Sequence, residues 1–378
     1  MKNFKLFLKI NILLIVVFSA VSLYAQQLGS LSHNGEIRNY TYYTPSNWDG
    51  ESSLPLLCVL HGLTQTGSGI MNVTQFNQLA EEGNFIVMYP SGINNAWNAN
   101  MNVSVSSADD IGYIETLFQF FESNFHTIPE RRYLCGFSNG AFMCHKLACE
   151  SNLCFAGIAS VSGTMSDTVY NNCENPTFNT SVLHIHGTLD AVVPYSGSIT
   201  TGISVDQLIN KWSNFLNCNS QPNVSDIPNV NLFDFSTCEK QEFNCQLNDL
   251  QFVKIIGGGH QWPGINTWNG GVGTINMDFY SPAYIWEFLK TKTCETTNAL
   301  IEFNNNYSIY PNPSTGIINF PELKQFLKIE VFDLYGKLVF NIVNFEGENI
   351  TLPLKNGTYN IKITSNSKEI KWRKVIII

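Results

Sequence analysis

The sequence holds a serine, an aspartate and a histidine in an order and in surroundings that suit nucleophilic catalysis. Ser138 is the centre of residues 136–140 (GFSNG), Asp190 follows 52 residues later and His260 a further 70. A serine hydroxyl is a weak nucleophile until a base takes its proton, and the base needs a carboxylate to hold its tautomer. Ser138, Asp190 and His260 are therefore the candidate nucleophile, acid and base of a hydrolase.

The local context of the three residues strengthens this interpretation. By itself the pattern Gly-x-Ser-x-Gly is as often an ordinary turn, but here it follows a strand-like run and precedes a helix-like one. That is the setting of a nucleophile elbow, in which glycines allow a sharp turn that exposes the serine. Residues 184–190 (HIHGTLD) and 257–260 (GGGH) also follow strand-like runs, so we expect all three side chains at one edge of the sheet.

The tetrahedral intermediate of acyl transfer needs two N–H donors. We expect the first from Asn139, directly after the nucleophile. The second is expected from Leu63 in residues 61–65 (HGLTQ), with Thr64 as the alternative. His61 is interpreted as a support of this loop through hydrogen bonds.

Three tryptophans, Trp97, Trp262 and Trp268, lie outside the periodic segments, and Trp262 is two residues from His260. An indole beside a reaction centre suits stacking on a phenolic acyl group or a sugar ring. Trp97 and Trp262 are therefore candidate substrate-binding residues, whereas Trp268 is expected to pack its own loop.

Two further histidines, His184 and His186, point to the same face of a strand and are predicted to be structural. The sequence has no Cys-x-x-Cys and no Cys/His cluster with metal-ligand spacing. We therefore expect neither a metal nor another cofactor.

The elements that must position these residues alternate between strands and helices. Continuous apolar runs such as 54–60 (LPLLCVL) are typical of parallel strands covered on both faces. The alternating segment 37–44 predicts an antiparallel edge strand. The sequence thus predicts the α/β-hydrolase class of α/β fold, a mostly parallel sheet with helices on both faces. The further predicted strands are 85–89, 132–135, 155–161, 182–185 and 252–256, and the predicted helices are 72–82, 111–121, 140–150, 205–216 and 284–291.

The beginning of the chain has the composition of an export signal. Residues 1–25 combine three lysines with an apolar run too short for an ordinary membrane span, and Ala25 is a small residue for cleavage. No later segment is a candidate span, so we expect a mature protein outside the cytoplasm with no membrane span.

Charge and composition divide the rest of the chain into an acidic larger part and a basic C-terminal part. Residues 26–306 hold 9 Lys/Arg and 24 Asp/Glu, and residues 307–378 hold 9 and 6. The acidic excess repels phosphate backbones, so no nucleic-acid partner is expected. We predict a hydrolase domain over 26–294, a polar linker over 295–306, and a β-sandwich of short strands separated by turns over 307–378.

All ten cysteines precede the linker, which in an exported protein indicates disulfides. Possible pairs are Cys149 with Cys154, Cys218 with Cys238, and Cys245 with Cys294, although the sequence does not fix connectivity. Cys58 and Cys135, inside apolar runs, are predicted to be buried thiols.

Over roughly residues 30–292 the sequence resembles secreted esterases that include feruloyl esterases, acetylxylan esterases and polyhydroxybutyrate depolymerases. The motifs that carry the resemblance are PLLCVLHGLTQTG, YPSG with AWN, DDIGYIETL, YLCGFSNGAFMCHKLACE, HIHGTLDAVVPY and GGGHQWPG. It implies the triad derived above and no cofactor. Leu63 stands where relatives often carry a cysteine, which changes a side chain but not a backbone donor.

The C-terminal part resembles the sorting domain of the type IX secretion system of the Bacteroidetes. The matching residues are IYPNP, VFDLYGK, GTY and the terminal KVIII. The resemblance implies that the secretion machinery is a partner; the alternative is a carbohydrate-binding module, which has a similar fold.

The expectation is a secreted serine carboxylesterase acting on feruloyl or acetyl esters of xylan-type polysaccharides. A polyester depolymerase is the alternative, because an aromatic cleft would also hold a polymer chain. A non-enzymatic glycan-binding protein on a hydrolase scaffold is a further alternative, which the complete triad disfavours.

Overall fold

The computed structural model describes residues 26–102, 105–174, 176–266, 271–294, 311–319, 325–333, 337–347, 349–365 and 370–378. The predicted export signal, the predicted linker and Trp268 lie outside the described residues. The chain divides into two compact units, Met1–Glu295 and Thr296–Ile378, and each is described by itself.

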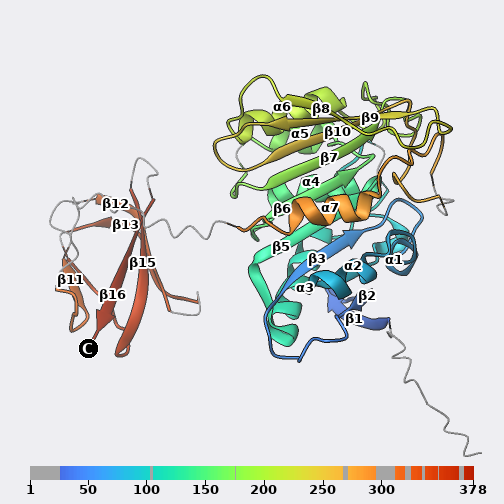
Figure 1. Cartoon of the computed structure of the whole chain (residues 1–378). Helices are drawn as coiled ribbons and strands as arrows, with labels where there is room; N and C mark the ends of the chain where they lie inside the picture. The colour runs from blue at the N-terminus through green and yellow to red at the C-terminus, as the bar shows by residue number, and fades with distance from the viewer. Residues whose placement is uncertain are drawn as a thin grey trace, which may run out of the picture. The chain divides into compact units, whose positions relative to one another are not determined.

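A ten-stranded sheet forms the centre of the first unit (Figure 1), in the order β1-β2-β4-β3-β5-β6-β7-β10-β9-β8. The strands from β4 through β10 in this order are parallel. Antiparallel pairs extend both ends. The strands are β1 Gln27–His33, β2 Glu36–Tyr43, β3 Leu54–Leu60, β4 Ile86–Pro90, β5 Thr127–Phe137, β6 Gly157–Val161, β7 Ser181–Gly187, β8 Asn223–Ile227, β9 Thr237–Phe243 and β10 Leu250–Ile256.

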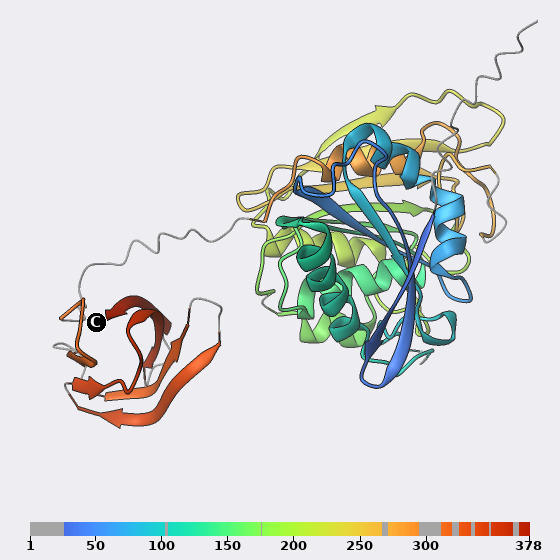
Figure 2. The same ribbon diagram turned by 90° about the horizontal axis from the view of Figure 1, so that it is seen from below.

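Helices cover both faces of the sheet, as Figures 1 and 2 show. One core cluster joins the sheet to α3, α4, α5 and α6, and another joins it to α1, α2 and α7. The helices are α1 Gly67–Thr74, α2 Phe76–Gly83, α3 Asp110–Phe125, α4 Asn139–Glu150, α5 Asp167–Asn172, α6 Val205–Phe215 and α7 Ser281–Leu289, and a 3-10 turn spans Ile93–Asn95. This is the predicted α/β-hydrolase architecture.

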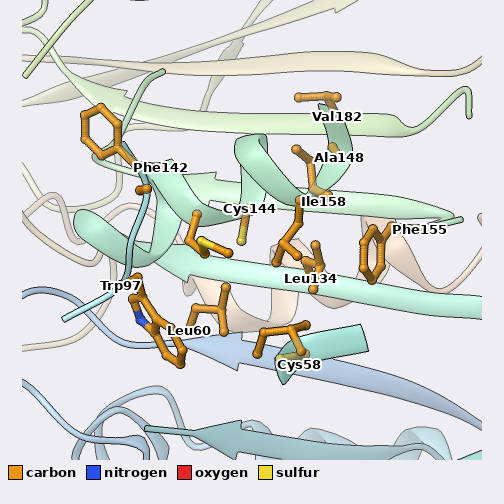
Figure 3. Close-up of a cluster of buried hydrophobic side chains, with 14 of the residues drawn as sticks. Cys58, Leu60, Trp97, Leu134, Phe142, Cys144, Ala148, Phe155, Ile158 and Val182 are labelled. Atoms are coloured by element: carbon orange, nitrogen blue, oxygen red, sulfur yellow. The ribbon is translucent and has the colours of Figure 1, made fainter. Parts of the chain in front are cut away.

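The sequence of β3 is apolar throughout because both faces of this strand are covered. Leu56, Cys58 and Leu60 face the α4 side, where Figure 3 shows the side chains of Cys58 and Leu60, while Leu57 and Val59 face the other side. Successive side chains of a strand point to opposite faces, so a sheet covered on both faces has no polar alternate positions.

Two predicted details of the elements are wrong. Segment 37–44 is not an edge strand, because β1 pairs with the outer side of β2. The helix predicted over 72–82 is two helices, separated by Gln75 with a left-handed φ of 52°.

Three disulfides are present, and none is one of the pairs named from the sequence. The partners lie on segments that only the fold brings together. The main-chain N–H of Cys294 donates to Glu130 O, and the N–H of Ala156, two residues after Cys154, donates to Arg132 O. The segments of Cys154 and Cys294 therefore both flank β5. Cys58 and Cys135 are buried free thiols, as predicted. The disulfides are Cys149–Cys173, Cys154–Cys294 and Cys218–Cys245.

The second unit contains two antiparallel sheets that share one apolar core. Ile318 and Ile350 from the two-stranded sheet pack with Ile329, Ile361 and Val375 from the four-stranded sheet. This arrangement matches the predicted all-β sandwich. The strands are β11 Ile317–Asn319, β12 Gln325–Phe332, β13 Leu338–Glu346, β14 Asn349–Thr351, β15 Gly357–Ser365 and β16 Ile370–Ile377.

Within the described residues, no helix is both long and apolar enough to cross a bilayer.

Candidate active site

Ser138 occupies a sharp turn between β5 and α4. Its φ of 51° and ψ of −119° lie in a region that residues with a side chain rarely adopt. The turn is held because the Ser138 N–H donates to Val161 O at 2.9 Å, while Ser138 O accepts from Ala141 N at 2.9 Å. The half-buried serine therefore sits in a strained conformation that its neighbours maintain.

The two glycines of the pentapeptide are required by close packing. A Cβ on Gly136 would lie 2.3 Å from Gly140 O, and a Cβ on Gly140 would lie 2.3 Å from Leu60 O. The helix behind Ser138 thus approaches the end of β3 more closely than any other residue type allows.

Asp190 and His260 meet beyond the ends of β7 and β10. Asp190 Oδ2 lies 2.8 Å from His260 Nδ1, and both residues are buried. A carboxylate only accepts hydrogen bonds, so Nδ1 is the protonated nitrogen and Nε2 carries the lone pair that a general base needs. The other oxygen, Oδ1, accepts from the N–H groups of Val192 at 2.9 Å and Val193 at 2.7 Å, which fixes the carboxylate.

The imidazole lies beside the nucleophile turn. The rings of His260 and Phe137, the residue before Ser138, have centroids 4.8 Å apart. The main chain of His260 forms a two-way bridge with Val272, at 2.7 and 3.0 Å. A Cβ on Gly259 would lie 2.4 Å from Val272 O, so glycine at this position allows the two segments to approach closely.

The two main-chain donors predicted for an oxyanion are available. Asn139 N–H is in the first turn of α4, where amides have no partner within the helix. Among the described residues no acceptor contacts Leu63 N–H. Thr64 N–H donates to Asn95 O at 2.8 Å, so the alternative donor is already occupied.

His61 is buried and has the supporting role that its position suggests. Its Nε2 accepts from Gly92 N–H at 2.9 Å, so its Nδ1 is protonated and donates to Gly62 O at 2.7 Å. Burial lowers the pKa of His61 to about 4, which keeps this arrangement neutral.

The substrate-stacking role predicted for Trp97 and Trp262 does not agree with the structure. Both side chains are 0% exposed. Trp262 stacks on Phe137 at a centroid distance of 5.7 Å, and the Trp97 indole lies against His61 at 4.8 Å. Neither indole has a surface to offer a substrate, because each fills the core under the site.

His184 and His186 are buried on β7 and hydrogen-bonded, in agreement with the structural role predicted for them. His184 Nδ1 lies 2.7 Å from Ser160 Oγ, and His186 Nε2 donates to Val193 O at 2.9 Å. His186 Nε2 also lies 3.5 Å from Asp190 Oδ2. This proximity is not predicted from the sequence, although the two residues are only four positions apart. Within the described residues, no group of three or more side chains is arranged to hold a metal.

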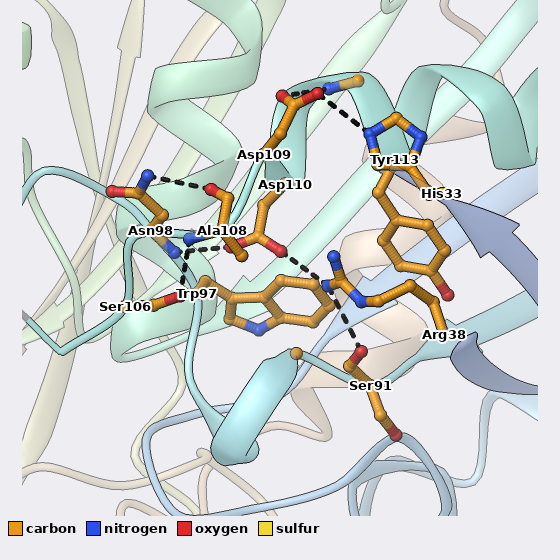
Figure 4. A network of polar contacts seen from close by, with 12 residues as sticks. His33, Arg38, Ser91, Trp97, Asn98, Ser106, Ala108, Asp109, Asp110 and Tyr113 are labelled. Atoms are coloured by element: carbon orange, nitrogen blue, oxygen red, sulfur yellow. Dashed lines mark hydrogen bonds and ion pairs between the residues drawn. The ribbon is translucent and has the colours of Figure 1, made fainter. Parts of the chain in front are cut away.

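A buried ion pair near the site has no signal in the sequence. Arg38 Nη2 donates to Asp110 Oδ1 at 2.6 Å, and Asp110 Oδ2 accepts from Asn98 N–H at 2.7 Å (Figure 4). The pair joins β2, the start of α3 and the segment that contains Trp97.

Two parts of the chain match known protein families. Residues 113–220 match the phospholipase/carboxylesterase family, and residues 308–378 match a secretion system C-terminal sorting domain. The second match identifies the β-sandwich as a sorting domain and not as a carbohydrate-binding module.

Individual relatives agree with the first match. A bifunctional acetylxylan esterase/xylanase of Neocallimastix patriciarum is 24% identical over 75% of this chain and 37% of its own length. A probable feruloyl esterase C of Aspergillus niger is 27% identical over 43% of this chain and 58% of its own length. This chain therefore spans less than two thirds of the length of either relative.

Among solved structures, this chain matches an acetyl xylan esterase from Aspergillus awamori. It is 16% identical, with a TM-score of 0.48, and the match covers 70% of this chain and 99% of that one. The sequence matches confirm the resemblance to feruloyl and acetylxylan esterases that the motifs indicate.

Proposed function

We propose that this chain is an exported serine carboxylesterase in which Ser138, His260 and Asp190 form the catalytic triad. The observation that carries the proposal is the 2.8 Å contact between Asp190 and His260, beside a strained serine turn. A buried carboxylate holds a histidine next to a serine with an unfavourable φ. Catalysis explains this combination more simply than a structural role does. The esterase names of the relatives support the same reaction.

The reaction proceeds through an acyl-enzyme. His260 Nε2 accepts the Ser138 proton as Oγ bonds to the ester carbonyl carbon, and the carbonyl oxygen becomes an oxyanion held by the N–H groups of Asn139 and Leu63. The intermediate then expels the alcohol, which takes the proton from His260. Water, deprotonated by His260, attacks the acyl-serine and releases the acid, and Ser138 recovers its proton.

Ester-bearing polysaccharide, with feruloyl or acetyl groups on xylan, is the substrate class that we propose. Besides the relatives, a hollow of about 250 Å³ supports it, because half of the residues that line it are polar and suit sugar hydroxyls. The hollow is next to the nucleophile helix, because Asn139 Nδ2 lies 3.4 Å from Met101 Sδ in its wall. Its polar lining residues are Asn98, Asn100, Ser106 and Thr168.

One observation favours the second candidate, hydrolysis of an aliphatic polyester. The loop between β8 and β9 exposes four large apolar side chains to between 69% and 89%. Thr237, which follows this loop, pairs with Ile256, so the loop lies at the end of β10 from which the His260 segment departs. Exposed apolar groups gathered near a site can bind an apolar surface. The four are Val230, Leu232, Phe233 and Phe235.

We further propose that residues 1–25 direct export and that the type IX machinery, reading the sorting domain, carries the protein to the cell surface or beyond. The sorting-domain match supports the second step.

A panel of substrates tests the function. Purified protein is assayed on nitrophenyl acetate, methyl ferulate, acetylated xylan and polyhydroxybutyrate, with release of acid as the readout. We expect turnover of the first three; turnover of polyhydroxybutyrate alone would favour the polyester candidate, and turnover of none would contradict both.

A further inference from the structure

Trp97 contacts both segments that supply the proposed oxyanion donors. Its main-chain N–H donates to Asn139 Oδ1 at 2.7 Å, and its carbonyl accepts from Asn139 Nδ2 at 3.1 Å. The Asn139 side chain therefore pairs with the Trp97 main chain much as a neighbouring strand would. These two bonds fix the residue whose own N–H is the first donor.

The indole of the same residue contacts the second segment. Trp97 Nε1 donates to His61 O at 2.9 Å, two residues before Leu63. Figure 3 shows the indole beside Leu60, at the point where the chain leaves β3 for the 61–65 loop. The indole thus fixes the start of the segment that carries the second donor.

Trp97 is itself anchored from the far side. The N–H of the next residue, Asn98, donates to Asp110, whose other oxygen is bound by Arg38 (Figure 4). Arg38 and Asp110 are 3% and 1% exposed, and the Arg38 guanidinium lies 4.0 Å from the centre of the Tyr113 ring. Breaking a buried ion pair leaves an uncompensated charge, so the pair resists displacement of residues 97–98.

We propose that Trp97 is a positioning residue that holds the Asn139 and Leu63 donors at a fixed separation. The inference rests on the esterase function proposed above. Donors that are preorganised around a developing oxyanion stabilise the transition state more than the bound ester. Loosening their spacing therefore slows turnover without weakening substrate binding.

The test is Trp97→Phe, which keeps a buried aromatic ring and removes the N–H bound to His61 O. We expect kcat for nitrophenyl acetate to fall by about 10-fold, a part of the 10²–10³ that losing a whole donor costs, with KM unchanged within about twofold. The inhibition constant of an aryl trifluoromethyl ketone, whose adduct with serine carries an oxyanion, should rise in proportion to the loss of kcat/KM.

Trp212→Phe is the matched control. Trp212 is 1% exposed and donates its indole N–H to His145 Nδ1 at 3.2 Å, so it loses an equivalent buried bond. Its partner, His145, lies on α4 six residues after Asn139, beyond the first turn that carries the first donor. We expect a similar fall in melting temperature with kcat and the ketone inhibition constant unchanged.

A second variant covers the case in which Trp97→Phe does not fold. Asn139→Ala removes the side-chain bonds to Trp97 and keeps the Asn139 N–H, so it should show the same loss of kcat and of ketone affinity. The inference is overturned if folded Trp97→Phe hydrolyses esters as wild type does or, where Trp97→Phe does not fold, if Asn139→Ala does so. It is also overturned if Trp212→Phe lowers kcat as much as Trp97→Phe does. Wild-type protein that neither hydrolyses esters nor reacts with a fluorophosphonate would instead contradict the proposed function, and the inference with it.

Discussion

His260 Nδ1 lies 2.8 Å from Asp190 Oδ2, although the two residues leave different strands 70 positions apart. Asp190 is fully engaged at this point, because its other oxygen accepts two main-chain N–H groups. We therefore expect Asp190→Asn to lower kcat by about 10⁴ with KM little changed, since the amide would favour the wrong imidazole tautomer.

Two other aspartates serve as controls for that substitution. Asp249 pairs with Lys292, and Asp278 accepts the N–H groups of Val230 and Asn231, so neither is free to act on His260. Asp249→Asn and Asp278→Asn should keep normal kcat for nitrophenyl acetate. Near-normal turnover by Asp190→Asn would contradict the assignment of the acid.

Buried neutral histidines should make the hydrolase unit sensitive to acid. Burial lowers the pKa of His61 to about 4 and that of His145 to about 3, from an ordinary histidine pKa of 6.5. At a pH between the folded-state pKa and 6.5, these histidines bind more protons in the unfolded chain than in the folded one. The free energy of unfolding is therefore largest above pH 6.5 and falls as the pH falls towards 4. The loss should be about 2 kcal/mol per histidine between pH 7 and pH 5.

Urea unfolding of wild type and His145→Gln at pH 7 and pH 5 measures this loss. Glutamine keeps an acceptor for the Trp212 N–H but does not titrate. Between pH 7 and pH 5, the His145→Gln variant should lose about 2 kcal/mol less unfolding free energy than wild type does. Equal losses would mean that His145 is protonated in the folded state at pH 5.

The exposed apolar loop separates the two substrate candidates. Phe233→Ser with Phe235→Ser should reduce binding to polyhydroxybutyrate granules severalfold if the polyester candidate holds, and should leave binding to acetylated xylan unchanged. Ile199→Ser, which removes a side chain that is 91% exposed, is the control. Sedimentation of bound protein is the measurement, and equal binding by wild type and both variants would remove the support that this loop gives to the polyester candidate.

The sorting domain has a core of its own and should contribute nothing to small-ester hydrolysis. Deletion of residues 296–378 should therefore leave kcat and KM for nitrophenyl acetate unchanged. In the native host the deleted protein should fail to reach the outside, which cell fractionation measures. Loss of small-ester activity, or normal export, would contradict this division of roles.

The sequence places Ser138, Asp190 and His260 at one edge of the sheet because the relevant information is local. Each of Ser138, Asp190 and His260 follows an apolar strand, and parallel strands bring their carboxyl ends to one edge. Trp97 and Trp262 could not be placed in the same way. A tryptophan outside periodic segments can face solvent or fill the core, and only the packing around His61 and Phe137 decides between them.

Disulfide pairing and the Arg38–Asp110 pair depend on contacts between distant segments. Cys154 and Cys294 are 140 residues apart and meet because both their segments lie beside β5. Arg38 lies on a strand that mixes exposed and buried positions, and nothing in its neighbours indicates a buried partner 72 residues away. Such long-range pairs follow from the fold and not from local pattern.

Covalent labelling of the nucleophile tests the assignment of Ser138 most directly. Wild type, Ser138→Ala and Ser162→Ala are treated with a fluorophosphonate probe, and the adduct is located by mass spectrometry. Ser162 is the control because it also follows a strand, with a φ of 53°, but is buried with 1% exposure. We expect an adduct on Ser138 in wild type and in Ser162→Ala, and neither adduct nor ester hydrolysis in folded Ser138→Ala. Labelling or hydrolysis by Ser138→Ala at the wild-type rate would contradict this assignment.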